Sequence, residues 1–332
     1  MLLSRAAWAY FAATLLALAI LYLVGDNWWP GTLLLFGPRW SLALPLALLL
    51  PLALWRCRRA LLPLALGGLI VAIPFMGLRW SFFAPRADEG GVVMRVLTCN
   101  VRTGNFNSGA LSRVIRDRDV DLVALQECPP SVQLDLPAGW QKTQAGVITV
   151  MSRYPIQALE PVLAKHPPHV WTRHSLLPCI VATPRGTVAF HSVYLPSPRY
   201  GLQNSLDRST GIDPRKAGLL VSETDNRRNV AHMVREAAQT KGMPFILAGD
   251  FNMPVESAIY QETWSDLSNA FSKRGRGYGW SFRDSVRSIP VDVRIDHVLS
   301  GNGASPLSCE VGPDVGSDHR PLIAEILIAQ AR

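Results

Sequence analysis

Apolar residues are distributed unevenly along the chain, and this divides it into two parts. Before residue 84, long apolar runs are interrupted by few charges, whereas later short apolar stretches alternate with polar loops. The first pattern is typical of membrane spans and the second of a mixed globular domain. We predict a membrane anchor over residues 1–83, a polar linker over 84–91 and one catalytic-sized domain over 92–332.

The anchor contains three apolar segments. Ala6–Val24 carries no charge and is long enough for a helix that crosses about 30 Å of hydrocarbon. Ala60–Leu78 is also uncharged, whereas Thr32–Trp55 includes Arg39, so that its spanning part could be only Trp40–Trp55. No small-residue cleavage site follows the first segment, and two more apolar segments come after it. We therefore predict three transmembrane helices rather than a cleaved secretory signal.

Arginines near the ends of these segments predict the orientation. Arg5 precedes the first segment, and the Arg-Cys-Arg-Arg sequence at 56–59 joins the second to the third. The positive-inside rule places both in the cytoplasm, although Arg39, Arg79 and Arg86 would then lie on the outer side and weaken the bias. With three spans, we predict a multi-pass protein of a bacterial inner membrane whose large domain is extracytoplasmic.

The second part of the chain reads as an α/β domain. Residues 92–101 are expected to form a strand, 109–120 an amphipathic helix and 121–128 the next strand, a unit that favours parallel pairing. Another helix is expected over Arg227–Thr240. Further strands are expected at Gly146–Met151, Leu177–Ala182, Thr187–Leu195, Phe245–Ala248, Arg294–Leu299 and Leu322–Ile328. Many strands and few helices predict two packed mixed sheets flanked by helices.

Several of these strands end in polar side chains. The stretch Phe245–Pro254, "FILAGDFNMP", runs from four apolar residues into Asp250 and Asn252, although burying an unpaired acid costs on the order of several kcal/mol. Other strand ends and the last polar turn offer the same kinds of group, at Asn100, Glu127, His191, Asp296 and Asp318-His319. Gathered at one sheet edge, these groups would form an acidic pocket that needs a counter-ion.

The order of these motifs resembles the endonuclease/exonuclease/phosphatase superfamily, which has the DNase I-like fold. The segments are "LTCNV", "LVALQE", "VAFHSVYLP", "ILAGDFN", "RIDHVL" and "GSDHRPL", and together they cover about residues 93–328. Each segment is weakly specific alone, whereas six in the family's order are specific. The resemblance implies a four-layer sandwich of two mixed sheets between helices, and a metal-dependent hydrolase acting on phosphoester or phosphoanhydride bonds.

The resemblance also implies a divalent-metal site. Glu127 resembles the family's principal metal-binding acid, Asn100 the amide beside the metal and the phosphate, and Asp318 a further acid on the metal side. Hard oxygen ligands favour Mg²⁺ or Mn²⁺ as the cofactor, and no cluster of cysteine and histidine indicates zinc.

Other residues resemble the family's catalytic groups. Asp250 resembles the acid that orients or deprotonates the attacking water, and Asn252 the amide that holds this water and a phosphate oxygen. His319 resembles the histidine that hydrogen-bonds the scissile phosphate, and Asp296 the acid that pairs with it. An acid partner favours the protonated imidazole, which can stabilise charge on the phosphoryl oxygens.

Two further sets of residues leave alternatives open. For the remaining phosphate contact the family uses a histidine or a tyrosine; this chain offers both His191 and Tyr194, and we favour His191. His297 is expected to be structural. Outside the cytoplasm disulfides could form, but we favour buried free thiols for the four cysteines of the large domain, which are Cys99, Cys128, Cys179 and Cys309.

The substrate is not fixed by the fold. Two long loops, 196–226 and 268–290, are basic with interspersed aromatic residues, a composition that suits nucleic acid and equally a lipid phosphate beside an anionic membrane. The net charge of +8 does not discriminate, whereas a membrane tether raises the effective concentration of substrates in the same bilayer.

The tether favours a lipid substrate. The chain resembles membrane-anchored bacterial members of the superfamily, some of which are associated with hydrolysis of isoprenoid-lipid pyrophosphates. We predict a phosphoesterase whose partners are the bilayer and a phosphorylated envelope lipid. A nuclease acting on incoming DNA is the second hypothesis. A non-catalytic membrane receptor is the third, and it is disfavoured because every acid, amide and imidazole that the chemistry needs is present.

Overall fold

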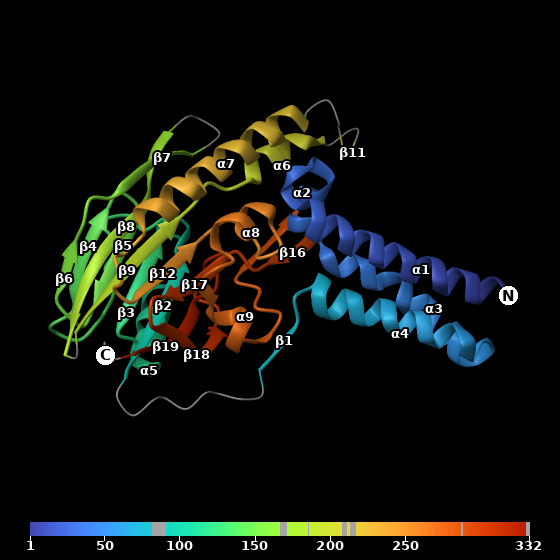
Figure 1. Cartoon of the computed structure of the whole chain (residues 1–332), viewed down its shortest axis with the longest axis horizontal. Coiled ribbons are helices and arrows are strands. Elements are labelled where there is room, and N and C mark those ends of the chain that lie inside the picture. Colours follow the sequence, from blue (N-terminus) through green and yellow to red (C-terminus); the bar gives the residue numbers. More distant parts are fainter. Residues whose placement is uncertain are drawn as a thin grey trace.

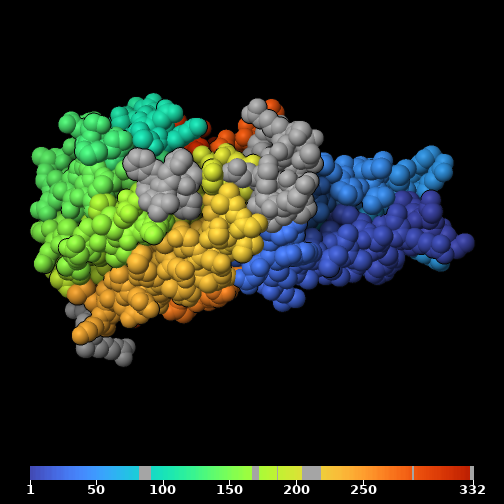
Figure 2. All heavy atoms as spheres, turned by 90° about the horizontal axis from the view of Figure 1, so that it is seen from above, coloured from blue at the N-terminus to red at the C-terminus, as the bar shows by residue number. Residues whose placement is uncertain are grey.

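An elongated helical bundle projects from one end of a wider α/β domain (Figures 1 and 2). It corresponds to the part predicted to be a membrane anchor, and we call it the anchor. The computed structural model describes residues 1–81, 91–166, 171–184, 186–207, 211–212, 217–286 and 288–329. All but the last residue of the linker predicted over 84–91 therefore lies outside the described residues.

The large domain contains two mixed sheets. One has seven strands in the order β13-β17-β12-β9-β8-β6, with β7 also paired to β8. These strands are β6 (Ile156–Ala158), β7 (Val162–His166), β8 (Trp171–Thr183), β9 (Gly186–Tyr194), β12 (Phe245–Asp250), β13 (Ser268–Asn269) and β17 (Asp296–Gly301). β9 and β12 are parallel, and the other neighbours are antiparallel.

The second sheet has six strands in the order β18-β19-β2-β3-β5-β4. These strands are β2 (Val92–Asn100), β3 (Leu122–Gln126), β4 (Gln141–Ala145), β5 (Ile148–Ser152), β18 (Ala304–Val311) and β19 (Leu322–Ile328). β2 and β3 are parallel, which confirms the pairing predicted for the opening strand-helix-strand unit.

The two sheets pack face to face and helices cover their outer faces. The core between the sheets includes Phe190, Ile246 and Val298 from one sheet, and Val96 and Leu122 from the other. Helix α5 (Ser108–Asp117) covers the six-stranded sheet. Helices α7 (Ala217–Ala237) and α8 (Ala258–Trp264) cover the seven-stranded sheet (Figure 1). The predicted four-layer DNase I-like sandwich is confirmed.

Smaller elements complete the large domain. They are α6 (Arg199–Ser205), α9 (Ala270–Arg274) and three two-stranded pairs: β1 (Arg79–Trp80) with β14 (Arg276–Gly277), β10 (Leu206–Asp207) with β11 (Gly211–Ile212), and β15 (Phe282–Val286) with β16 (Ile289–Val293).

Helix α7 begins at Ala217 and not at Arg227, so the loop predicted over 196–226 contains α6 and the first turns of α7. The buried positions of α7 include Leu220, Arg227 and Val234, at helical spacing. A buried arginine in the middle of this stripe interrupts the apolar pattern, which is why the sequence conceals the first half of the helix.

The anchor is a bundle in which α1, α3 and α4 lie side by side, with the N-terminus at the end far from the large domain (Figure 1). Ala7 and Tyr10 of α1 pack on Ala53 of α3, on Ala60 and on Leu64 of α4. Its helical segments are α1 (Leu2–Ala19), the turns Ile20–Val24 and Gly25–Asn27, α2 (Trp29–Phe36), the turn Arg39–Ala43, α3 (Leu44–Arg56), the turn Arg58–Ala60, α4 (Leu61–Ile70) and the turn Val71–Phe75.

Two continuous helical stretches, Leu2–Asn27 and Arg58–Phe75, are long and apolar enough to cross a membrane. The middle segment is bent by 86° between Trp29–Phe36 and Arg39–Arg56. It makes a third candidate span if the bent pair counts as one. The break at Gly37-Pro38 leaves α2 at the domain end of the anchor and lets α3 run back along α1 (Figure 1).

All five cysteines are free, and the four of the large domain are buried. Cys99 and Cys128 lie in the core beneath α5, on the face opposite to the core between the sheets. This agrees with the prediction of buried thiols.

Candidate active site

One row of candidate site residues, formed by Tyr194, Asp250 and Asp296, lies at the edge of the seven-stranded sheet. Strand register places Asp250 between Tyr194 on one neighbouring strand and Asp296 on the other. The approach of β9 is close: a Cβ added to Gly249 would lie 1.9 Å from the carbonyl oxygen of Val193. Glycine is therefore required before Asp250, which explains the Gly-Asp sequence at the end of β12.

A second row, formed by Asn100 and Glu127, lies at the edge of the six-stranded sheet. Asn100 ends β2 and is paired with Gln126 of the parallel strand β3, so Glu127 follows directly at the same sheet edge. Glu127 has a φ of +50°, a backbone conformation that residues other than glycine rarely adopt. Such conformations cluster at functional sites, and here the turn brings the carboxylate back over the sheet edge.

Asn100 connects the two rows. Its Nδ2 donates to Glu127 Oε1 at 3.2 Å and to Asp250 Oδ2 at 3.0 Å. Tyr194 Oη donates to Glu127 Oε1 at 2.9 Å, and Thr103 Oγ1 donates to Glu127 Oε2 at 3.1 Å. Four distant parts of the chain thus meet here, and two of them supply the carboxylates.

Asn252 holds Asp250 from the loop that follows β12. Its backbone N–H donates to Asp250 Oδ1 at 2.9 Å, and its Nδ2 donates to Asp250 Oδ2 at 3.0 Å and to the Leu195 carbonyl at 2.8 Å. Asn252 has a φ of +52°, so this loop, like the one at Glu127, adopts a rare backbone conformation at the candidate site.

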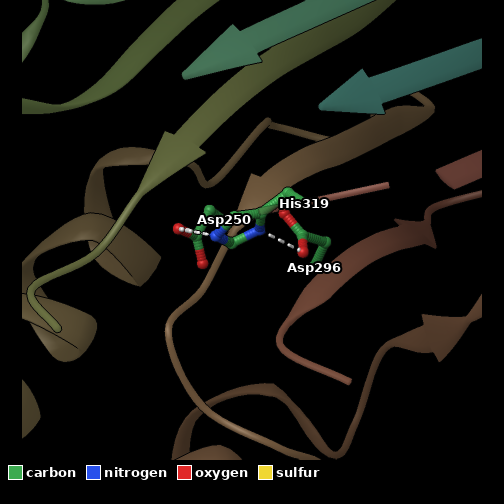
Figure 3. A group of neighbouring side chains, drawn as sticks. All are labelled: Asp250, Asp296 and His319. Carbon is green, nitrogen blue, oxygen red and sulfur yellow. Dashed lines mark hydrogen bonds and ion pairs between the residues drawn. The ribbon is translucent and has the colours of Figure 1, made fainter. Parts of the chain in front are cut away.

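His319 lies between two carboxylates (Figure 3). Its Nδ1 is 2.8 Å from Asp296 Oδ2, and its Nε2 is 3.9 Å from Asp250 Oδ2. Ser281 fixes Asp296, because its Oγ accepts the Asp296 backbone N–H at 3.1 Å. Ser317 holds the backbone of His319: its Oγ accepts the His319 N–H at 3.2 Å and donates to the Asn100 carbonyl at 2.8 Å.

The surroundings shift the acid-base properties of these groups. Burial raises the pKa of Asp250 to about 7 with help from Asp296, although His319 opposes the rise. Burial lowers the pKa of His319, but the carboxylates of Asp296 and Asp250 outweigh it and bring that pKa to about 9. Burial also disfavours ionised Glu127, but hydrogen bonds from Asn100, Tyr194 and Thr103 hold its pKa below the usual value. At neutral pH the site therefore combines the ionised carboxylate of Glu127, the protonated imidazole of His319 and the carboxyl group of Asp250, whose pKa is close to the pH.

Tyr194, and not His191, is at the site. Neighbouring strand residues point to opposite faces, and Phe190 and Tyr194 face the core between the sheets while Val193 faces the helices. The buried His191 shares the helix-facing side, and neither of its ring nitrogens has a hydrogen-bond partner. The preference for His191 as the phosphate contact is therefore wrong.

Asp318 lies beside the site and is held by arginines. Its Oδ2 is 3.7 Å from Arg102 Nε and 3.5 Å from Arg199 Nη2, and the Arg199 guanidinium lies over the ring of Phe282. Both arginines are about half exposed. The structure does not bring Asp318 into the group of Asn100, Glu127 and Asp250, and its metal-binding role stays a prediction.

His297 is structural in its contacts, as expected. It is fully buried, and its Nε2 lies 2.9 Å from the Met253 carbonyl. Sequence reasoning missed Thr103, Ser281 and Ser317, which hold site residues through hydroxyl groups. Of the three, Ser317 carried a signal, because it stands within the Gly-Ser-Asp-His turn.

The donors present fit a divalent metal ion. Oxygen atoms of Glu127, Asp250 and Asn100 are the ligand types that Mg²⁺ and Mn²⁺ prefer. Asp250, Asp296 and His319 also offer three atoms within 4.8 Å of one another. However, the hydrogen bond between His319 and Asp296 occupies two of these groups, and the raised pKa of His319 favours a proton on the ring. The Glu127 side is thus the better place for the cation.

Comparison with known proteins agrees with this geometry. Residues 97–319 match the Endonuclease/Exonuclease/phosphatase family, and the chain belongs to this family. Members are divalent-metal-dependent hydrolases that act on phosphoester bonds. No curated protein matches the chain.

Several solved structures are similar to the chain at low identity. An endonuclease/exonuclease/phosphatase from Beutenbergia cavernae DSM 12333 is 18% identical, with 71% of this chain and 72% of that chain covered and a TM-score of 0.46. D. rerio TDP2 complexed with single-strand DNA product is 14% identical, with 70% and 98% covered and a TM-score of 0.49. The human Nocturnin catalytic domain with bound sulfate is 11% identical, with 70% and 94% covered and a TM-score of 0.46. At these values the neighbours carry no argument about substrate.

Proposed function

We propose that the protein is a membrane-anchored, divalent-metal-dependent phosphoesterase that hydrolyses a phosphate or pyrophosphate of an envelope lipid. The observation that carries this proposal is that buried ion pairs join an apolar helical bundle to the domain in which Asn100, Glu127, Asp250 and His319 converge. Arg227 pairs with Asp26 of the anchor at 3.6 Å, and Glu256 pairs with Arg39 of the anchor at 3.0 Å. A site fixed to the bilayer in this way meets lipid substrates at high effective concentration.

The residues of the site fit hydrolysis by an activated water. A divalent cation bound at Glu127 and Asn100 would neutralise charge on the phosphate and polarise it. Asp250, with a pKa of about 7, is suited to accept the proton of the attacking water at neutral pH. The water oxygen then forms the new bond to phosphorus while the bond to the leaving oxygen breaks.

Charge that develops on the phosphoryl oxygens meets fixed donors. His319 is protonated at neutral pH because its pKa is about 9, and its Nε2 faces Asp250. We assign to it the stabilisation of this charge. Tyr194 and Thr103 hold the Glu127 carboxylate in place, so we assign to them the positioning of the metal ligand.

The anchor has features that support a bilayer location. Trp8 of the first candidate span and Trp28 directly after it are each 49% exposed. A helix separates these positions by roughly 30 Å, about the thickness of the hydrocarbon core. Trp55 is also exposed, and it lies two residues after Ala53, which packs with Ala7 of α1. Exposed tryptophans at both ends are typical of interfacial belts.

The same end of the bundle gathers the basic residues that set the orientation. Ala7 and Tyr10, next to Arg5, pack on Ala53 and Ala60, which flank the Arg56–Arg59 stretch. Under the positive-inside rule this end lies in the cytoplasm. We therefore propose that the site lies on the outer side of a bacterial inner membrane.

A groove away from the site bears on the nuclease hypothesis. It has a volume of about 880 Å³, and it includes the stacked rings of Tyr278 and Trp280. Its arginines are partly neutralised, since Arg95 pairs with Asp119 and Glu325, and Arg118 pairs with Glu310. Six arginines and four acids line the groove, so it still carries a small excess of positive charge, which suits nucleic acid and an anionic lipid head group alike. The groove therefore does not decide between the two substrates.

A parallel substrate assay tests the proposal. Purified full-length protein in detergent is incubated with a polyprenyl pyrophosphate, a sphingomyelin-type lipid or plasmid DNA, with Mg²⁺ or Mn²⁺ and then with excess chelator. We expect metal-dependent release of phosphate or of a phosphorylated head group from a lipid, and loss of this release in Asp250→Ala. DNA nicking without lipid turnover would contradict the lipid assignment and support the nuclease hypothesis.

A further inference from the structure

The domain end of the anchor rests on the loop that carries the candidate catalytic residues. We call residues Gly25–Arg39 of the anchor the elbow, and residues Phe251–Ala258 the catalytic loop, because this loop follows Asp250 and contains Asn252. The elbow is tightly folded: a Cβ added to Gly31 would lie 1.9 Å from the carbonyl oxygen of Gly25. The backbones of Gly25 and Gly31 are therefore in close contact at the start of the elbow.

Asp26 of the elbow binds the end of the catalytic loop. Its Oδ2 accepts the hydroxyl of Ser257 at 2.7 Å, and its Oδ1 accepts the backbone N–H of Ala258 at 2.8 Å. Its side chain is completely buried. A buried carboxylate that satisfies both oxygens in this way fixes the backbone it contacts.

Asp26 also pairs with the arginine that binds the beginning of the loop. Arg227 of α7 is completely buried and lies 3.6 Å from Asp26 Oδ2. Its Nη2 donates to the backbone carbonyl of Asn252 at 3.0 Å, whereas its Nε and Nη1 make no hydrogen bond. Its guanidinium faces the ring of Phe36 in the elbow. Arg227 therefore links Asp26 of the anchor to the backbone of Asn252, in addition to the hydrogen bonds that Asn252 makes with Asp250 and Leu195.

A second anchor residue clamps the middle of the loop. Arg39 Nη1 donates to Glu256 Oε2 at 3.0 Å and to the Phe75 carbonyl at 3.0 Å. Glu256 is 3% exposed and Arg39 10%. The loop is thus gripped at Asn252, Glu256, Ser257 and Ala258 by groups that belong to the anchor or are paired with it.

We propose that Asp26 is a positioning residue of the catalytic site: through Arg227 it holds the backbone of Asn252, and thereby Asp250, in the geometry needed for hydrolysis. The anchor is then part of the active enzyme and does more than tether it. This inference rests on the proposed phosphoesterase function. It concerns residues of the membrane part that touch no reacting atom.

The test uses full-length protein in detergent and a small soluble phosphodiester, bis(4-nitrophenyl) phosphate, with Mn²⁺, so that membrane presentation of the substrate plays no part. The variants are Asp26→Asn, Arg227→Met and the double variant. Since small misplacements of catalytic groups cost up to about 100-fold in rate, we expect Asp26→Asn to lower kcat about tenfold or more, with KM changed less than about twofold. If Asp26 acts through Arg227, the double variant has about the kcat of Arg227→Met alone.

Hydrogen exchange measures the hold on the loop without any turnover. In Asp26→Asn, amides of 251–258 should exchange at least about tenfold faster, whereas those of β2 and β19 keep their wild-type rates. The matched control is Asn27→Ala. Asn27 is the next residue of the same turn, and its side chain accepts from the partly exposed Arg228, so this variant should leave kcat and exchange unchanged.

The outcomes separate the two proposals. Unchanged exchange in 251–258, an unchanged kcat despite faster exchange, or rate losses that simply multiply in the double variant would each overturn the positioning role of Asp26. Wild-type protein that fails to cleave the probe would contradict the proposed function, and the exchange data would still decide whether the anchor holds the loop.

Discussion

Replacing His191 by leucine tests whether this histidine is a buried residue that takes no part in the catalytic site. Burial lowers the pKa of His191 from 6.5 to about 4, so below pH 6.5 the unfolded chain binds a proton that the folded chain does not. Stability therefore falls as the pH drops from 6.5 towards 4. This difference in pKa between the folded and the unfolded chain lowers the free energy of unfolding by roughly 3 kcal/mol once the pH is below both pKa values.

The leucine variant should lack this loss. At pH 7.5 it should be at least as stable as wild type, because both ring nitrogens of His191 lack hydrogen-bond partners and an unsatisfied buried polar group costs about 1–3 kcal/mol. The measurement is urea unfolding of full-length protein in detergent, followed by tryptophan fluorescence at several pH values from 7.5 to 4.5. His166 and His297 are also buried with pKa values lowered to about 4, but they contribute equally to both proteins.

Two results would refute this reasoning. Parallel stability curves for wild type and His191→Leu would show that the imidazole titrates normally in the folded protein. A large loss of metal-dependent phosphodiester cleavage in His191→Leu would restore the histidine to the site. The control is His232→Gln, at an exposed histidine of α7, which should follow wild type in both measurements.

Other changes test the site itself. Tyr194→Phe removes the hydrogen bond to Glu127, and we expect kcat on bis(4-nitrophenyl) phosphate to fall about tenfold with the fold intact by circular dichroism; a wild-type rate would contradict the contact. Asp250→Asn should lower kcat at least about 100-fold at every pH, since it removes the proposed proton acceptor, and a rate that recovers at high pH would argue for another base. Arg199→Ala removes a positive charge that pairs with Asp318 beside the site. We therefore expect KM for an anionic substrate to rise about threefold to tenfold with kcat nearly unchanged. A lower kcat with an unchanged KM would indicate a role in the chemical step.

The order of the polar strand ends predicts the fold and most of the site. Asn100, Glu127, Asp250, Asp296 and His319 do converge, because parallel and antiparallel register aligns the ends of neighbouring strands. This much is accessible from sequence, since Asn100 and Asp250 end strands and Glu127 follows one directly. Asp296, expected at a strand end, is instead the first residue of β17, which is antiparallel to β12 and so starts at the same edge of the sheet.

The choice between His191 and Tyr194 was not accessible in the same way. Both faces of β9 are buried, one against the other sheet and one against helices, so the strand shows no alternation of polar and apolar residues that would reveal which side faces the site. Without that alternation, the sequence does not reveal whether His191 or Tyr194 lies on the face of β9 that meets the other sheet.

The link between anchor and site was also hidden. Arg39 interrupts an apolar segment and Asp26 lies just after one, and each is buried against a partner more than 200 residues away in sequence. Charges in apolar segments are costly and often functional, and this is the one signal that could have marked them.

The central claim, that Glu127 anchors a divalent metal at a phosphoester-hydrolysing site, is tested most directly by Mn²⁺ binding followed through the EPR signal of the free ion. Wild-type full-length protein should bind Mn²⁺ saturably, and Glu127→Gln, which keeps the size of the side chain but removes its charge, should bind at least about tenfold more weakly. Equal binding by the two proteins, or hydrolysis that persists in excess chelator, would contradict the account.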